Sequence, residues 1–493
     1  MVKINRTSLY IYFSLFLFLL MSGLIMLWTE NYNLLLLMAT ILFVLGLVYS
    51  LRNIYENIFL FCFLICFFTF LLGGQILNTF FHVYGYNFPT EIENHTNLLL
   101  LISIAGLLAG YFLSLKIEKK KTNESLKIDY ESSYFKNARK ISKYYFYVTY
   151  CFWLLILLDN VLYVLQNGYT AYYLSYSSRI PAILREIGYM SPVALFIYMS
   201  TMPKKKDAKI PILLYIAYLV ISLGTGRRIY FMTGILIIFG YMMIRNVVAP
   251  EDKPWVSKKS LIKICILIPI LLITMYLFEY VRSGDYVGNA SNWSPIVGFF
   301  VRQGTSINVI KYTDLFFDRL NPDAHYSLYN TIRWLQNSFF NEFLNLDLNF
   351  VIGKQTQETA IAGTYLADFV SYNANKAIYS EGMGYGSCYI AELYVDFGYI
   401  GVLLGNMLFG GILCKLLKTA MNNGNIWMSA IGLYMIDAIF QAPRATFDSF
   451  FGSLLYFNSW GPLVLVYVIT SIYNTRNKNS IKNQSKSHIL LRG

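Results

Sequence analysis

Long apolar runs, separated by short polar segments, recur along most of the chain. Windows of about 17 to 25 apolar residues are long enough to cross about 30 Å of hydrocarbon as helices. The pattern predicts about twelve such helices, and therefore an all-α polytopic integral membrane protein. The predicted spans are 8–28, 33–51, 58–80, 97–115, 144–165, 189–202, 210–226, 229–244, 261–280, 394–414, 427–442 and 450–473.

These spans divide the chain into three parts. Nine spans lie in residues 1–280, a long segment with shorter apolar patches covers residues 281–393, and three spans with a basic tail occupy residues 394–493. The middle segment is rich in aromatic residues and has few strand-like alternations, so we expect short helices lying on the membrane. Composition agrees with this class, because 56% of the residues are hydrophobic and only 14% are charged, against about 25% charged in a soluble domain.

Lys and Arg are distributed unevenly between the two sides of the predicted topology. If the N-terminus is cytoplasmic, 28 of the 40 cations lie in inner segments, as the positive-inside rule requires. We therefore expect both termini in the cytoplasm and the segment 281–393 outside it. Attraction of these cations to the anionic inner leaflet of the lipid bilayer then explains the basic net charge, and no nucleic-acid partner is expected. The six Cys and four His residues are scattered, so we expect neither a metal site nor a cofactor.

The outer cations are mostly arginine. Inside, 22 of 28 cations are lysine, whereas outside nine of twelve are arginine. A planar guanidinium grips a phosphate or carboxylate with two parallel hydrogen bonds, so the outer face is suited to an anion. The alternative is that these arginines pair with acids of the same loops. The outer arginines selected as candidates are Arg179, Arg227, Arg228, Arg282, Arg302, Arg319, Arg333 and Arg444.

Arg227 and Arg228 follow a glycine-rich break inside an apolar stretch. Residues 210–244 would form a single helix about 52 Å long, which is too long for one crossing, so the chain must fold back at Gly224 and Gly226. The turn falls on the outer side because lysine-rich segments flank the stretch. A cation pair there indicates a bound anion or a water-filled cavity, and the following helix start adds free N–H groups. Alternatively, both side chains reach lipid headgroups.

A glycine-rich stretch precedes and begins the tenth predicted span, with the sequence GMGYGSCYIAELYVDFGYIGVLLGNMLFGG. Its glycines permit close helix packing, with Gly401 and Gly405 as a GxxxG pair. Glu392 and Asp396 lie four residues apart and therefore project from one helix face near the outer surface. They could hold the arginines in place, or one could accept a proton from a sugar hydroxyl. Tyr389 is a candidate to contact a sugar ring.

The order of these features resembles the Wzy-type O-antigen and capsular polysaccharide polymerases. TGRR at an outer turn, a large outer loop, GYGSCYIAELYVDFGYIG and a late arginine in QAPRATFDSFFG follow in that order, and QNGYTAYYLSYSSRIP is similar to the first outer loop of the family. The resemblance implies a glycosyltransferase of the bacterial cytoplasmic membrane with a GT-C-like architecture. It implies polymerisation of undecaprenyl-pyrophosphate-linked oligosaccharide repeat units, with a flippase and a chain-length regulator as partners.

In such a reaction the pyrophosphate is the leaving group, and positioned cations would stabilise its charge. A sugar hydroxyl would attack with inversion, without a metal ion, assisted by Glu392 or Asp396. The arginines expected at the leaving group are Arg227 or Arg228, Arg282 and Arg444. The residues expected to bind the rest of the substrate are Arg302, Arg319, Arg333, Arg179 and Tyr389.

Two alternative functions share this layout of helices. The first is a lipid-linked oligosaccharide flippase or transporter, and the second is the O-antigen ligase, whose chemistry is similar. The large outer loop and the lack of matching halves in the sequence argue against a transporter.

Overall fold

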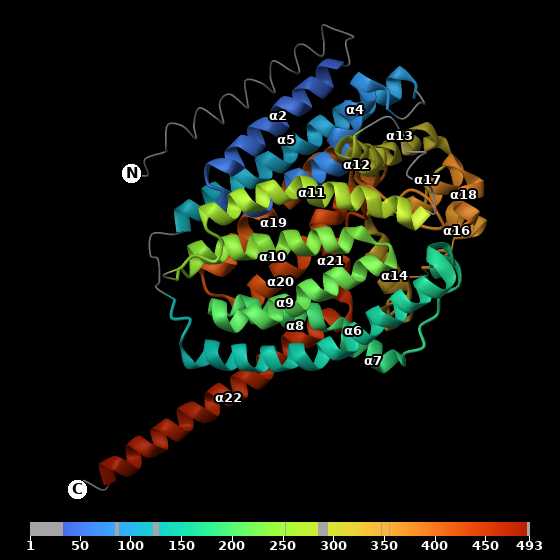
Figure 1. The fold of residues 1–493 in the computed structure, drawn as a ribbon. Coiled ribbons are helices and arrows are strands. Elements are labelled where there is room, and N and C mark those ends of the chain that lie inside the picture. The colour runs from blue at the N-terminus through green and yellow to red at the C-terminus, as the bar shows by residue number, and fades with distance from the viewer. Residues whose placement is uncertain are drawn as a thin grey trace.

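The computed structural model describes residues 33–83, 88–121, 128–251, 253–283, 294–346, 348–353 and 355–490. These residues are mostly helical, and none of them forms a β-strand (Figure 1). The main helices are α2 (Asn33–Arg52), α3 (Ile54–Phe67), α5 (Thr90–Lys121), α6 (Ser133–Ser175), α8 (Ser191–Ser200), α9 (Lys205–Ser222), α10 (Arg228–Val248), α11 (Lys258–Ser283), α19 (Tyr389–Asn422), α20 (Ile426–Gln441) and α22 (Phe457–Leu490).

The described helices agree with the predicted membrane spans. Ten are long and apolar enough to cross a membrane, and a bent pair, Ser449–Leu455 with Phe457–Arg476, brings the number to eleven if it forms one span. Each predicted span from 33–51 onward overlaps one of these elements. The first predicted span, 8–28, lies outside the described residues. The prediction of an all-α polytopic membrane protein is therefore confirmed.

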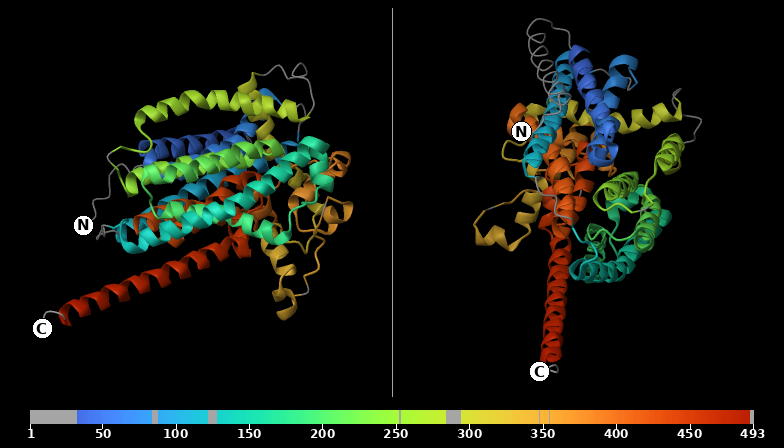
Figure 2. Two further views of the ribbon diagram at one scale, coloured as in Figure 1. Left: turned by 60° about the horizontal axis from the view of Figure 1, so that its bottom comes forward. Right: turned by 90° about the vertical axis from the view of Figure 1, so that its left-hand side faces the viewer.

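The long helices run side by side, and short helices gather at one end of the bundle (Figures 1 and 2). We refer to this end as the loop end, because it holds the described part of residues 281–393. The C-terminal part of α22 projects beyond the opposite end (Figure 2). The short helices are α12 (Pro295–Gln303), α13 (Ile307–Leu315), α14 (Tyr329–Gln336), α15 (Phe339–Phe343), α16 (Gln357–Ala362), α17 (Leu366–Ala374) and α18 (Lys376–Ser380).

One helix runs further toward the loop end than its apolar run predicts. The predicted span ends at residue 165, whereas α6 continues to Ser175. The backbone of Gly168 leaves helical geometry with φ of 85°, a value that favours glycine, and the helix then resumes. The stretch QNGYTAYYLSYSSRIP, which resembles an outer loop, is therefore helical over much of its length.

Glycine allows α5 and α19 to pack backbone against backbone. A β-carbon on Gly110 of α5 would overlap the carbonyl group of Met407, and one on Gly410 of α19 would overlap that of Leu107. The predicted GxxxG residue Gly405 packs instead against the side chain of Leu393 in its own helix and against the ring of Phe447. The close helix contact therefore depends on a different set of glycines from the one that the motif indicates.

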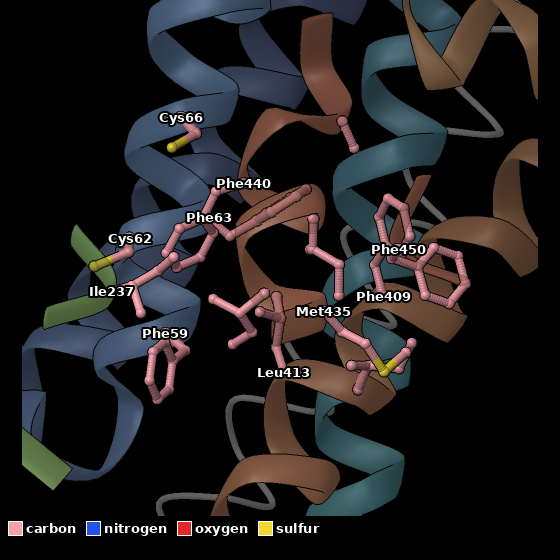
Figure 3. Packing of buried hydrophobic residues seen from close by; sticks show 14 of the residues in the cluster. Phe59, Cys62, Phe63, Cys66, Ile237, Phe409, Leu413, Met435, Phe440 and Phe450 are labelled. Carbon is pink, nitrogen blue, oxygen red and sulfur yellow. The ribbon is translucent and has the colours of Figure 1, made fainter. Parts of the chain in front are cut away.

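The apolar core lies where α3, α10, α19 and α20 meet (Figure 3). Phe59 and Phe63 of α3 are buried, and their rings pack near Phe440 and Phe409, with centroids 6.3 Å and 6.1 Å apart. Apolar packing of this kind fixes the helices that end at the loop end, and therefore fixes the side chains that they carry there.

Candidate functional site

The turn between α9 and α10 separates the two adjacent arginines of TGRR. A single 3-10 turn ends at Gly226, whose φ of 78° favours glycine, and α10 begins at Arg228. Arg227, just before the helix, lies over the ring of Tyr172 in α6, with its guanidinium carbon 5.4 Å from the ring centroid. The Arg228 guanidinium donates to the Met275 carbonyl of α11 at 2.7 Å. The two side chains therefore contact different helices.

Arg302 lies close to the Arg228 contact because α11 and α12 pack tightly. Tyr276 follows Met275 in α11, and its ring lies directly against Gly298 of α12, where a β-carbon would overlap the ring. One turn further along α12, the Arg302 guanidinium carbon lies 5.9 Å from the centroid of the same ring. Met275 and Tyr276 therefore connect Arg228 with Arg302.

Gln303, the next residue of α12, reaches a third arginine. Arg444 lies in the 3-10 turn after α20 (η7, Ala442–Arg444) and donates from Nη1 to the side-chain oxygen of the buried Gln303 at 3.1 Å. The following residue, Gly304, packs on Gly74 of α4 (Gly73–Phe81) so closely that a β-carbon on Gly74 would overlap the Gly304 backbone. This backbone contact holds Gln303 in place.

These contacts join three arginines that are far apart in the sequence. We refer to Arg228, Arg302 and Arg444 as the arginine row; all three side chains are partly exposed. Only Met275, Tyr276 and Gln303 lie between the three guanidinium groups along this chain of contacts. Positive charges gathered in this way favour the binding of an anion that has several negative oxygens. Across the part of the chain that the structure describes, no cluster of three or more His, Cys, Asp and Glu side chains could hold a metal ion.

The two predicted acids hold different segments of the loop end to α19. Glu392 is fully buried, and its carboxylate accepts the backbone N–H of Phe447 at 2.7 Å and the hydroxyl of Ser387. Asp396 accepts the backbone N–H and the hydroxyl of Ser327, at 2.7 Å and 2.5 Å. These hydrogen bonds favour a holding role for both carboxylates over proton acceptance.

Tyr389 lies inside the bundle. Its side chain is fully buried, its hydroxyl donates to the Asn406 side chain at 2.6 Å, and its ring centroid lies 5.2 Å from that of Phe409. A sugar ring could reach Tyr389 only if the surrounding helices moved apart.

The other predicted arginines lie elsewhere at the loop end. Arg319 is exposed, with its guanidinium carbon 5.1 Å from the ring centroid of Phe316. Arg333 on α14 and Arg179 after α6 are also exposed. The side chain of Arg282, near the end of α11, lies outside the described residues. No described contact places Arg179, Arg319 or Arg333 in the arginine row.

A pair of stacked tyrosines lies near the starts of α10 and α19. The rings of Tyr329 and Tyr365 stack with centroids 4.5 Å apart. Burial raises the pKa of Tyr365, and the nearby Tyr329, Asp368, Glu392 and Tyr230 raise it further. Because Tyr230 is in the first turn of α10 and Glu392 is in the first turn of α19, the stacked pair lies near both helix starts. Such a pair combines flat apolar surface with polar hydroxyl groups.

Three polar residues at or near the loop end are not among the candidates predicted from the sequence. Gln303 is uncharged and belongs to no motif. Asp448 accepts the backbone N–H of Thr331 at 2.7 Å and so holds the start of α14. Asp437 is an acid inside a predicted span, and that position alone is a signal of function that could have been used.

A family model described as O-antigen polysaccharide polymerase Wzy matches residues 10–477, which includes all of the residues discussed above. The chain belongs to this family. Wzy proteins act on lipid-linked oligosaccharide in the membrane and polymerise O-antigen repeat units. The family membership predicted from TGRR, the large loop and the glycine-rich stretch is therefore confirmed. Comparison with curated proteins and with solved structures gave no significant match.

Proposed function

We propose that this Wzy chain transfers a growing glycan from undecaprenyl pyrophosphate to a hydroxyl of a second lipid-linked repeat unit. The bond between the anomeric carbon and the pyrophosphate oxygen breaks, and a bond to the hydroxyl oxygen forms with inversion. The hydroxyl proton is released to water. Negative charge develops on the pyrophosphate in the transition state, so groups that stabilise this charge accelerate the reaction.

The observation that carries this proposal is the arginine row. Arg228, Arg302 and Arg444 come from α10, α12 and η7, and the contacts through Tyr276 and Gln303 bring them together. We assign the pyrophosphate to these three guanidinium groups, each of which can bind two oxygens in parallel. Fixed cations in a partly dry site replace the divalent metal that many glycosyltransferases use, so the reaction is metal-independent in this proposal.

Two further arginines extend the anion site in this proposal. Arg227 precedes the first residue of the row and lies over the ring of Tyr172. Arg282 lies near the end of α11, the helix that contributes Met275 and Tyr276. Both are assigned to the lipid side of the pyrophosphate, where the carrier approaches from the membrane.

We assign the sugars of the substrate to the loop segment next to the arginine row. The stacked Tyr329 and Tyr365 supply a flat surface for a sugar ring. The exposed Arg179, Arg319 and Arg333 are donors for hydroxyl or carboxylate groups of the approaching glycan. Glu392 and Asp396 keep the segments around this surface in place rather than accepting the proton, as their hydrogen bonds favour.

The distribution of lysine supports a loop end that faces outward from the bacterial cytoplasmic membrane. The opposite end carries most of the lysines, as expected for the cytoplasmic side. In this orientation a flippase supplies lipid-linked units at the loop end, and a chain-length regulator is the partner that limits the product. Both termini are then cytoplasmic.

Single replacement of Arg228, Arg302 or Arg444 by Ala tests the proposal. We expect each change to lower the polymerisation rate by roughly 100-fold, as loss of one charge-stabilising donor does in other enzymes. Replacement by Lys should restore only part of the rate, because an ammonium group lacks the second parallel donor. The measurement is polymer length by glycan electrophoresis in a deletion strain that expresses each variant.

Arg52→Ala is the matched control, because Arg52 is an exposed arginine at the opposite end of the bundle. Protein abundance in the membrane must be equal for all variants. Polymer of normal length from all three Ala variants, at normal abundance, would overturn the assignment.

A further inference from the structure

A buried ion pair connects two helices at the loop end. Lys311 of α13 is fully buried, and its ammonium group donates to Oε1 of Glu93, in the first turn of α5, at 2.7 Å. The same nitrogen lies 5.3 Å from the ring centroid of Phe88. Replacing a buried ion pair by apolar side chains of similar volume often costs a protein no stability. Stability alone therefore does not explain the pair, and the proposed reaction gives it no role.

The carboxylate of this pair also binds a third helix. Gln75 of α4 is fully buried, and its Nε2 donates to Oε2 of Glu93 at 2.8 Å. That nitrogen also donates to Oδ1 of Asn97, one turn further along α5, at 2.8 Å. Each carboxylate oxygen of Glu93 thus accepts a hydrogen bond from a different helix. One side chain holds both α4 and α13 on the start of α5, at the loop end (Figure 1).

Both of these helices adjoin the glycine contact that holds Gln303 in place. In α4, Gln75 directly follows Gly74, which packs on the backbone of Gly304. On the other side, Lys311 lies seven residues after Gly304, in a segment that runs from α12 through a 3-10 turn into α13 without a loop. Each partner of the glycine contact is therefore followed by a side chain that donates to the same carboxylate.

The glycine contact has little direction of its own. Two backbones without β-carbons touch through van der Waals forces, which permit one segment to slide along the other. A hydrogen bond has a defined geometry, and buried polar groups can fix the register of packed helices in this way. We refer to Gln75, Glu93 and Lys311 as the Glu93 clamp, because together they restrict sliding at the glycine contact.

We propose that Glu93 is a positioning residue whose two hydrogen bonds set the location of Gln303, and with it the spacing between Arg302 and Arg444. Gln303 directly follows Arg302 and accepts from Nη1 of Arg444 at 3.1 Å, so a shift of its segment moves one arginine relative to the other. This inference rests on the proposed function, because the spacing matters only if these arginines bind one pyrophosphate. A misplacement of about 1 Å can lower a rate by about 100-fold.

The first test compares Gln75→Leu and Lys311→Met, each of which removes one hydrogen bond to Glu93. Both replacements fill the space with an apolar side chain, and Glu93 keeps contact with water because 22% of its side chain is exposed. Initial rates are measured with each purified variant in proteoliposomes, with lipid-linked repeat unit extracted from a strain that lacks this protein. We expect kcat to fall by roughly 10-fold in each variant, with KM changed by less than about twofold. The guanidinium groups still attract the substrate, whereas their geometry around the leaving group is lost.

Combining the changes distinguishes one clamp from independent damage. Gln75→Leu with Lys311→Met should lie within about threefold of the poorer single variant, because the clamp opens when either hydrogen bond is lost. Glu93→Ala added to Lys311→Met should likewise change kcat by less than about threefold. The Lys311→Met background is used because Glu93→Ala alone would leave a buried ammonium group without its carboxylate. Effects that multiply in the combined variants would show separate roles and would overturn the proposal.

Lys376→Met and Gln357→Leu are the matched controls, since both side chains are exposed at the loop end. Each should keep kcat and KM within about twofold of the unmodified chain. All rates are divided by the amount of folded protein, measured by size-exclusion chromatography in detergent. Normal kcat per folded molecule in Gln75→Leu and Lys311→Met would show that the clamp supports only the fold, and would overturn the positioning role.

A second measurement does not depend on activity. Spin labels at Asp318→Cys and Phe451→Cys, in a chain whose native cysteines are replaced, lie at exposed positions after α13 and after η7. The distribution of distances between them should be narrow in this chain, broader or shifted after Lys311→Met, and unchanged after Lys376→Met. An unchanged distribution after Lys311→Met would refute the clamp. Active Ala variants of the arginine row, together with a broadened Lys311→Met distribution, would instead refute the proposed function alone.

Discussion

Asp368 shows how burial alone can set the behaviour of an acid at the loop end. The side chain lies buried on α17, and burial raises its pKa from 3.8 to about 6, against the lowering effect of a hydrogen bond from Tyr379. Between these two pH values the folded chain keeps the proton and the unfolded chain releases it. The folded state then binds more protons than the unfolded state, so its stability falls as the pH rises through this window.

Replacing Asp368 by Asn should remove this loss of stability. Asn has nearly the same shape but does not ionise, so above about pH 7 the variant should be more stable by up to about 3 kcal/mol, the value of the pKa difference. Near pH 4 both chains carry an uncharged group in the fold, and their Tm values should nearly coincide. Thermal unfolding in detergent at several pH values measures the difference. A gap in Tm that does not change with pH would contradict a raised pKa.

The arginines and acids show how far single residues could be predicted. The enrichment of arginine over lysine on one side selected Arg228, Arg302 and Arg444 among the candidates, but it could not show which of the candidates meet. Their meeting depends on the contact of Tyr276 with Gly298, and no sequence pattern marks that contact. Similarly, the spacing of Glu392 and Asp396 gave a common helix face, whereas their hydrogen-bond partners depend on how the loop folds back.

At the scale of helices, the glycine contact between α5 and α19 determines where the loop end lies relative to the bundle. Gly110 allows the two backbones to touch, and α19 begins at the loop end with Tyr389 and Glu392. The GxxxG spacing of Gly401 and Gly405 did not identify this contact. A motif of two glycines shows that close packing is allowed on one face, but the partner helix must also present a smooth surface there.

Gly110→Ala and Gly411→Ala form a matched pair that tests the contact. The added methyl group at Gly110 would overlap the Met407 carbonyl group of α19, whereas at Gly411 it would meet only the end of the Ser114 side chain, at 3.3 Å. Gly110→Ala should therefore lower stability by about 1 to 3 kcal/mol, the usual cost of overpacking, and should lower the Tm and the abundance of the protein. Gly411→Ala should leave both nearly unchanged. Equal Tm values for the two variants would show that the helices separate without cost.

At the scale of the whole molecule, hydrophobicity predicted the spans well because hydrocarbon imposes one requirement on every crossing. Each backbone polar group must be satisfied within the segment, so a long apolar run in a membrane becomes a helix. The same requirement does not extend past the hydrocarbon, and the sequence therefore did not show that α6 continues to Ser175. The arrangement of the short helices at the loop end was also beyond prediction, since their contacts join residues distant in sequence.

The orientation of the whole molecule follows from the same charges and can be measured directly. Phe343 is 66% exposed at the loop end, and Asn423 is exposed in the turn between α19 and α20 at the opposite end. Cysteines introduced at these two positions, in a chain without its native cysteines, should react differently with a membrane-impermeant maleimide. If the loop end faces outward, Phe343→Cys is labelled in intact spheroplasts and Asn423→Cys only after detergent is added. Active polymerase must be confirmed for both variants. The reverse labelling pattern would place the arginine row in the cytoplasm and the lysine-rich end outside, against the positive-inside rule, and would overturn the orientation.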